Sequence, residues 1–204
     1  MQLIGMLDSP YVRRCAVSLK LLGIEFEHRA VSVFRHFDEF RSINPAVKAP
    51  TLVCDDGTVL MDSNLILQHA ESLATKARSL IPVSPTERLR DLRSLGLALA
   101  ACEKSISIIY ERNLRPVEKQ HEPWLERVRG QLLAACGDLE RELGRAELPY
   151  GSGDITQAGV TVAVAWSFLQ LMIPEIVVAS QYPAWRSFAL VAEQLPEFVS
   201  LPQQ

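Results

Sequence analysis

The sequence predicts two parts, a mixed α/β N-terminal part followed by an all-helical C-terminal part. Short apolar runs alternate with helical patterns in the order β-α-β-α-β-β-α over the N-terminal third. A stretch with two prolines and two serines follows, which is typical of a linker. Beyond it, apolar residues recur at helical spacing and no strand is needed. We therefore assign residues 1–76 to the α/β domain, 77–85 to a linker and 86–204 to the helical domain.

The N-terminal elements follow from local signals. Residues 2–7 form an apolar strand candidate, and Ser9 followed by Pro10 is the pattern of a helix N-cap. Gly23 should end that helix. The next expected elements are a strand at 25–31, a short helix at 34–43, a strand at 51–54, a turn at 56–57, a strand at 58–61 and a helix capped by Ser63. The β-α-β start requires a parallel strand pair and the hairpin an antiparallel one, so the sheet should be mixed.

The C-terminal part is predicted to be a helical bundle. Apolar residues recur every three or four positions over 92–109 and again over 125–139. Residues 158–173 alternate like a strand, but this run is apolar on both faces and is long for a strand. We therefore predict a helix buried on all sides there. A last helix is expected over 182–195.

Composition and charge narrow the function. The chain has 204 residues, of which 48% are hydrophobic and 22% charged, so it can bury a sizeable core. Its net charge of −3 gives no reason to expect nucleic acid or an anionic membrane as a partner. The four cysteines are far apart and lack metal-ligand spacing, so we expect free thiols and no metal. Without a signal-peptide pattern or a run of spanning length, a cytoplasmic, soluble protein is expected.

Three short segments could carry chemistry. Ser9 is most simply a helix cap, but a helix N-terminus also favours negative charge and lowers the pKa of a thiol held there. Pro50 is either an ordinary turn residue or a cis proline, and a cis bond would expose the Ala49 backbone to a peptide-like ligand. Ser63 and its helix N-terminus could hold a carboxylate while Asp62 accepts from an ammonium. A zwitterionic amino-acid head would satisfy both groups.

Together these segments resemble the cytosolic glutathione S-transferase family. The resemblance covers the whole chain and implies a thioredoxin-like N-terminal domain, a linker and an all-α helical bundle. The start at Ser9-Pro10 is similar to bacterial serine-type members, such as the YibF-like group. The residues that carry the resemblance are Ser9-Pro10-Tyr11-Val12-Arg13-Arg14, Asn44-Pro45, Lys48-Ala49-Pro50-Thr51-Leu52, Asp56-Gly57, Leu60, Asp62-Ser63, Ile66 and Glu71.

The resemblance also implies roles for single residues. Ser9 matches the catalytic position and would donate a hydrogen bond to the glutathione sulfur. Ala49 matches the residue before the cis proline, whose backbone pairs with the cysteinyl part of glutathione. Asp62 and Ser63 match the acidic-serine pair that holds the γ-glutamyl head. Lys48 lies beside this pocket and would meet a glutathione carboxylate.

The implied activity is a glutathione S-transferase that activates the glutathione thiol as a thiolate for attack on a small apolar electrophile. Glutathione is then a co-substrate, and no cofactor is required. The electrophile should bind near the end of the first C-terminal helix, where Tyr110, Arg112 and Arg115 are candidates. Glutathione-dependent disulfide reduction or isomerisation on the same site stays open, as does a non-catalytic scaffold, because fold does not fix function. The resemblance also implies a homodimer.

One motif of the family is incomplete here. Its members typically place Ser or Thr three residues before Asp at the start of the buried C-terminal helix. In this chain Thr156 is followed at that spacing by Gly159, which has no side chain to complete a capping box. Asp154 with Gln157 offers the same spacing two residues earlier, so we expect that pair to cap the helix instead.

Overall fold

The computed structural model of the chain describes residues 1–146, 148–151 and 153–203, except for the side chain of Lys76. The described residues divide into two compact units. The first holds residues 1–81, 153–154 and 194–203, and the second holds 82–146, 148–151 and 155–193. Each unit is described by itself below. None of the helices in the described part of the chain combines the length and the apolar character needed to cross a membrane.

The first unit is built on a small mixed sheet, as the sequence predicts. Its strands lie in the order β2-β1-β3-β4, with β1 parallel to β2 and antiparallel to β3. Hydrophobic Leu3 of β1 pairs with Leu52 of β3, and both are fully buried. The elements are β1 (Gln2–Ile4), α1 (Pro10–Leu21), β2 (Glu27–Arg29), α2 (Phe37–Ile43), β3 (Thr51–Val53), β4 (Val59–Met61), α3 (Ser63–Leu73) and the 3-10 turn η1 (Lys76–Arg78).

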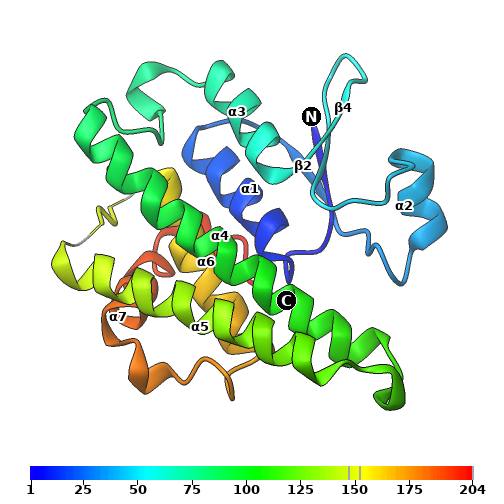
Figure 1. Cartoon of the computed structure of the whole chain (residues 1–204). Coiled ribbons are helices and arrows are strands. Elements are labelled where there is room, and N and C mark those ends of the chain that lie inside the picture. Colours follow the sequence, from blue (N-terminus) through cyan, green and yellow to red (C-terminus); the bar gives the residue numbers. More distant parts are fainter. Residues whose placement is uncertain (147, 152, 204) are drawn as a thin grey trace. The chain divides into compact units, whose positions relative to one another are not determined.

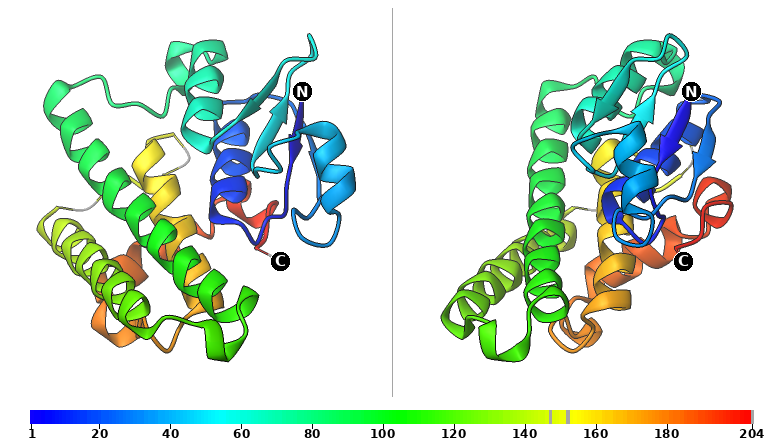
Figure 2. Two further views of the ribbon diagram at one scale, coloured as in Figure 1. Left: turned by 45° about the vertical axis from the view of Figure 1, so that its right-hand side comes forward. Right: turned by 90° about the vertical axis from the view of Figure 1, so that its right-hand side faces the viewer.

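Helices cover both faces of this sheet. Helices α1 and α3 pack against each other on one side, and α2 lies on the other side (Figures 1 and 2). Beneath α2, Phe40 packs with Ile4 and Val31 in a fully enclosed cluster that Ala49 borders. The alternation of side chains along β1 places Leu3 and Ile4 on opposite faces, so both helical layers are anchored to this strand.

The C-terminal residues belong to the first unit, whereas the sequence places them in the helical domain. Helix α8 (Pro196–Val199) packs against α1. Arg13 of α1 is 1% exposed; its Nε donates to the Leu201 carbonyl at 2.9 Å, and its guanidinium lies over the Phe198 ring at 5.6 Å. A buried arginine needs acceptors, and the returning chain supplies one. No local pattern in the sequence indicates which residues supply that acceptor.

The second unit is an all-helical bundle. Helices α4 and α5 run in opposite directions side by side, and α6 and α7 pack against them (Figures 1 and 2). Ser84 and Pro85, which the sequence assigns to the linker, begin α4: Ser84 is its N-cap, and the Ser84 hydroxyl accepts from the Glu87 N–H at 3.5 Å. The elements are α4 (Pro85–Leu114), η2 (Val117–Lys119), α5 (Glu122–Arg145), α6 (Gln157–Met172), η3 (Ala179–Gln181) and α7 (Pro183–Ala192).

The ambiguous run at 158–173 is helical, as predicted. Helix α6 is buried from Gln157 to Trp166 on every face, which explains why its sequence lacks a polar stripe. Trp166 packs against Trp185 of α7 with ring centroids 5.5 Å apart. The Trp185 indole N–H donates to the Val162 carbonyl at 2.8 Å, so this large buried ring leaves no polar atom unsatisfied.

The cap of α6 differs from the expected one. Thr156 is the N-cap, and its hydroxyl accepts from the Gly159 N–H at 3.2 Å. The same hydroxyl donates to the Asp91 carboxylate of α4, which also accepts from the Ala158 N–H. The expectation that Asp154 caps the helix is wrong. A carboxylate from another helix takes the place of the missing acid of the capping box, but it accepts from the unpaired backbone N–H of Ala158 and from the Thr156 hydroxyl.

Candidate functional site

The turn between β1 and α1 presents the Ser9 hydroxyl at a helix N-terminus. Ser9 is the N-cap of α1, and its Oγ accepts from the Val12 N–H at a long 3.5 Å. Capping uses a lone pair of the hydroxyl oxygen and leaves its hydrogen available for donation. Pro10 occupies the first helical position, where no backbone N–H is required. Ser9 can therefore cap the helix and also donate to a ligand atom.

The segment containing Ala49 lies against the start of α1. The Ala49–Pro50 peptide bond is cis. Gly5 marks the contact: a Cβ at this position would come within 2.6 Å of Val12 and 3.2 Å of Ala49. Gly5 also has a φ of 139°, which side-chain-bearing residues rarely adopt. Glycine there lets the first turn of α1 and Ala49 approach the end of β1 closely.

Lys48 and Asp62 come together although 14 residues separate them. The Lys48 ammonium lies 3.3 Å from Asp62 Oδ2, and both side chains are partly exposed. The other carboxylate oxygen accepts from the Asn64 N–H at 2.9 Å. Burial acts to raise the pKa of Asp62, but the bond from Asn64 and the nearby Lys48 and Arg14 hold that pKa below its usual value. The carboxylate is thus ionised at neutral pH and can receive an ammonium.

Ser63 is the first residue of α3, not its cap as the sequence suggests. The N-cap is Asp62, whose carboxylate accepts from a backbone N–H two residues on. The Ser63 hydroxyl instead accepts from Arg14 Nη1 at 3.0 Å, and the same nitrogen donates to Asn64 Oδ1 at 2.9 Å. The buried Arg14 therefore ties α1 to the first turn of α3.

Two residues in the segments around Lys48 and Asp62 have an unusual backbone conformation. Among the described residues other than glycine, Val47 and Asp62 alone have positive φ, at 47° and 72°. This region is unfavourable for side chains with a Cβ, above all for branched ones such as valine. Such strained conformations cluster at binding sites, where the surrounding structure holds them. Val47 directly precedes Lys48, and Asp62 carries the carboxylate that pairs with the Lys48 ammonium.

The candidates for the electrophile site lie in the last turns of α4. Arg112 pairs with Glu175 at 2.9 Å, and Arg115 pairs with Glu111 at 3.0 Å. The Tyr110 side chain is 43% exposed. Both cations therefore have carboxylate partners within the helical unit, and a role for Tyr110 and Arg112 toward an electrophile stays a prediction.

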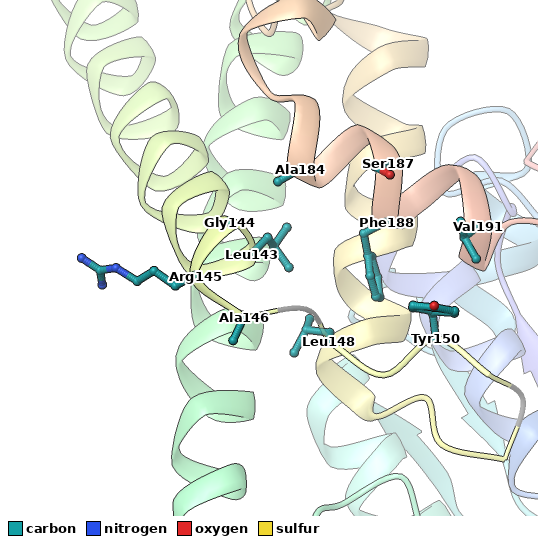
Figure 3. A pocket seen from close by; sticks show the side chains of 10 residues that line it. All are labelled: Leu143, Gly144, Arg145, Ala146, Leu148, Tyr150, Ala184, Ser187, Phe188 and Val191. Carbon is teal, nitrogen blue, oxygen red and sulfur yellow. The ribbon is translucent and has the colours of Figure 1, made fainter.

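The helical unit has a pocket of about 420 Å³ beside the C-terminal end of α5. The Arg145 side chain points away from the other lining side chains, and among those others only Tyr150 and Ser187 carry a polar side-chain atom, a hydroxyl in each case (Figure 3). None of the predicted site residues lines this pocket. Its lining residues are Leu143, Gly144, Arg145, Ala146, Leu148, Tyr150, Ala184, Ser187, Phe188 and Val191.

No role for Arg14 or Asn64 is predicted from the sequence. One signal could have drawn attention to Arg14: it stands beside Arg13 in a helix whose other residues are mostly apolar and buried. Charged residues are almost never fully buried unless they are paired. Two arginines in such a helix therefore call for partners elsewhere in the chain, but the sequence does not say which.

Comparisons with known proteins identify the family of the N-terminal domain. Residues 3–78 match the family model "Glutathione S-transferase, N-terminal domain". The GST-like protein YibF of Escherichia coli (strain K12) is 27% identical over 174 residues, which is 85% of either chain. These matches and the fold confirm the resemblance seen in the sequence: residues 3–78 match the N-terminal domain of glutathione S-transferases, and the chain as a whole is similar to members of that family. Membership of the serine-type group stays a prediction.

Two solved structures show the same fold. A glutathione transferase family member from Pseudomonas fluorescens Pf-5, with bound S-(propanoic acid)-glutathione, has a TM-score of 0.80 at 27% identity over 98% of both chains. A glutathione S-transferase from Methylobacterium radiotolerans in complex with glutathione sulfonate has a TM-score of 0.88 at 23% identity. It covers 100% of this chain and 95% of its own. The thioredoxin-like domain followed by a helical bundle is thereby confirmed.

Proposed function

We propose that the chain binds glutathione at its N-terminal unit and activates the thiol for attack on a small apolar electrophile. The observation that carries this proposal is the grouping of Asp62, Ser63 and Lys48, in which a carboxylate, a hydroxyl and an ammonium meet at one helix N-terminus. The choice of ligand is supported by the structure of the Pseudomonas fluorescens family member with bound glutathione, whose sequence is 26% identical to this chain.

The γ-glutamyl head fits these groups by charge. Its α-carboxylate would accept from the Ser63 hydroxyl and the first N–H groups of α3, where the helix dipole favours an anion. Its ammonium would approach the Asp62 carboxylate and compete with Lys48, whose ammonium lies 3.3 Å from Oδ2. Lys48 would then be released toward a carboxylate of glutathione, so the total charge of the pocket stays balanced.

The thiol would be activated at the start of α1. A free thiol has a pKa of about 8.5, which is lowered at a helix N-terminus. A hydrogen bond from the Ser9 hydroxyl to the charged sulfur would contribute about 1.5–3 kcal/mol. Since one pKa unit corresponds to about 1.4 kcal/mol, this bond alone could lower the pKa by about one to two units. A shift of about two units would make most of the bound thiol a thiolate at neutral pH, held ready for an electrophile.

The remaining parts of the proposal concern the electrophile and the assembly. We assign Tyr110 and Arg112 to the electrophile side, and expect their replacement to change KM for the electrophile more than binding of glutathione. A homodimer and a cytoplasmic location complete the proposal. The absence of disulfides among the four cysteines is consistent with a reducing compartment.

Replacing Ser63 by alanine is expected to weaken glutathione binding about tenfold, because the hydrogen bond lost involves a charged carboxylate. Calorimetric titration with reduced glutathione at neutral pH measures this directly. Ser72→Ala is the matched control, since Ser72 lies on the exposed side of the same helix and its hydroxyl donates to the His69 carbonyl. Equal affinities of the two variants would remove Ser63 from the site.

The wild-type titration tests the proposal as a whole. No binding at millimolar glutathione would overturn it and leave a scaffold with this fold. If glutathione binds, conjugation to an activated aryl halide should be detectable. Turnover of a glutathione mixed disulfide without any conjugation would replace transfer by disulfide reduction on the same site.

A further inference from the structure

Gly5 follows β1 directly and begins the turn that carries Ser9. Its N–H donates to the Arg29 carbonyl at 3.0 Å, and its carbonyl oxygen lies 2.8 Å from His28 Nε2. His28 and Arg29 are neighbours on β2, which runs parallel to β1. The same strand therefore holds both polar groups of the Gly5 backbone, and it holds the carbonyl through a side chain.

The hydrogen bond at the Gly5 carbonyl has a fixed direction. A carbonyl oxygen can only accept, so the imidazole of His28 must carry a proton on Nε2. This N–H is present in the neutral tautomer protonated at Nε2 and in the doubly protonated ring alike. His28 is thus a donor toward Gly5 in either charge state.

We propose that His28 is a positioning residue for Ser9: its bond to Gly5 holds the turn that presents the Ser9 hydroxyl to the glutathione sulfur. This inference rests on the proposed function and deepens it, because it names a residue on which activation of the thiol depends. His28 acts through the backbone of the turn and not by contact with the ligand.

The turn connects the two residues within a short stretch of chain. The Ser9 N–H donates to the Met6 carbonyl at 3.2 Å, which closes the turn. The peptide group that joins Gly5 to Met6 carries the carbonyl that His28 holds. Its orientation sets the direction in which the chain enters the turn. A rotation of this peptide group would therefore displace Ser9.

The need for such a restraint follows from the glycine. A Cβ at Gly5 would come within 2.6 Å of Val12 and 3.2 Å of Ala49, and the φ of 139° is one that residues with a Cβ rarely adopt. The close contact with the first turn of α1 thus requires glycine. Glycine, however, is the residue with the greatest backbone freedom. The bond from His28 opposes rotation at the one position of the turn where the side chain cannot.

The expected effect is larger on the chemistry than on binding. Hydrogen bonds weaken steeply when their geometry departs from the optimum, and a displacement of about 1 Å can lower a rate about 100-fold. The Ser9 hydroxyl must therefore be placed closely to stabilise a thiolate. Asp62 and Ser63 lie at the start of α3, on a different segment, so their part in binding should persist without His28.

The experiment compares His28→Leu, which removes the donor, with His28→Gln, whose amide nitrogen can replace it. In His28→Leu, kcat/KM for conjugation should fall about three- to tenfold, and the pKa of bound glutathione should rise by about half a unit to one unit. Affinity for S-methylglutathione, which has no thiol to ionise, should stay within about twofold of wild type. His28→Gln should recover most of the loss in kcat/KM.

His36→Leu is the matched control. It removes another bond between a histidine ring and the backbone of the same unit, because His36 Nδ1 accepts from the Ser32 N–H at 3.2 Å. This variant should keep the wild-type thiol pKa. An equal rise of the thiol pKa in His36→Leu and His28→Leu would overturn the inference, since the effect would then not depend on Gly5.

A double variant tests the route through Ser9. Because His28 acts by placing the Ser9 hydroxyl, His28→Leu should leave the thiol pKa unchanged when Ser9 is already alanine. A further rise in the Ser9→Ala background, as large as the rise in the wild-type background, would mean that His28 acts by another route and would overturn the inference.

The remaining outcomes separate this inference from the proposed function. A wild-type thiol pKa in His28→Leu would overturn the inference, and so would a loss of S-methylglutathione affinity as large as the loss of kcat/KM, because His28 would then only support the fold. If His28→Leu does not fold, His28→Asn replaces it: its shorter amide does not reach the Gly5 carbonyl, so the same losses are expected, and wild-type values would overturn the inference. If wild type binds neither glutathione nor S-methylglutathione, the proposed function itself fails.

Discussion

Replacing Ser9 by alanine is expected to lower kcat/KM for conjugation about 10- to 100-fold and to raise the pKa of bound glutathione by about one to two units. Both effects have one cause, the loss of a hydrogen bond to a charged sulfur that contributes about 1.5–3 kcal/mol. The acidic limb of the pH–rate profile should move to higher pH by the same amount, because the thiolate then forms at higher pH. Ultraviolet absorbance of the thiolate during a pH titration measures the pKa of the bound thiol.

The difficulty with this variant is that Ser9 is also a helix cap. Its removal costs about 1 kcal/mol of stability whatever its role in chemistry. The chain contains a matched control at Ser84, which also precedes a proline and also accepts from a backbone N–H at 3.5 Å. Ser84→Ala should lose comparable stability and keep the wild-type thiol pKa. If Ser9→Ala does the same, Ser9 is a cap and nothing more.

The features that the sequence predicted well depend on neighbours within a few residues. The Ser9-Pro10 start of α1 is one example, because both the cap and the first helical position are local. The hairpin at Asp56-Gly57 is another: Gly57 adopts a φ of 85°, and the strands on either side pair as expected. The helix at 158–173 was found despite its alternating pattern, because its length and its apolar character on all faces outweighed the period of two.

The features that the sequence missed depend on contacts between distant residues. Asp62 caps α3 in a positive-φ conformation. Asp62 and Ser63 are both residue types that favour an N-cap, so the sequence pattern places the cap one residue too late, at Ser63. Arg14 meets Ser63 across 49 positions, and Asp91 meets Thr156 across 65. No periodicity reports such pairs. Local patterns single out Ser9, Ala49, Asp62 and Ser63 as candidates, but only the family resemblance assigns them roles toward glutathione.

The cap of α6 provides the second large effect, this time on stability. Asp91 is 5% exposed and accepts from the Thr156 hydroxyl and the Ala158 N–H. Removing its carboxylate leaves both donors unsatisfied in a buried place. We expect Asp91→Ala to lower the free energy of unfolding by about 2–3 kcal/mol, since each bond to a charged group contributes about 1.5–3 kcal/mol and burying the charge offsets part of the sum. For a chain of this size the loss corresponds to a Tm lower by about 4–12 °C.

The hydrogen bond from the Thr156 hydroxyl to Asp91 forms a bridge between α4 and the start of α6. A double-mutant cycle separates the effect of this bridge from that of ordinary packing. Thr156→Ala alone should cost about 1–2 kcal/mol, the usual effect of losing an N-cap. Because Asp91 and Thr156 share one hydrogen bond, the double variant should lose less than the sum of the two single variants by about 1 kcal/mol or more. Asp154→Ala is the control, because Asp154 is exposed and does not cap the helix. Its stability should stay within about 0.5 kcal/mol of wild type. Strict additivity of Asp91→Ala and Thr156→Ala would contradict the bridge.

The bridge also has a pH signature with a definite sign. Burial raises the pKa of Asp91 above 3.8, and the bonds from Thr156 and Ala158 only partly offset that rise. The folded state therefore holds the proton more tightly than the unfolded state. The contribution of this group to stability is largest below pH 3.8 and falls as the pH rises through the folded pKa. Denaturant unfolding of wild type and Asp91→Asn across this window should show the difference in stability moving in favour of wild type as the pH falls. A difference that moves the other way would mean that the ionised carboxylate is the favoured form, with the two donors outweighing the cost of burial.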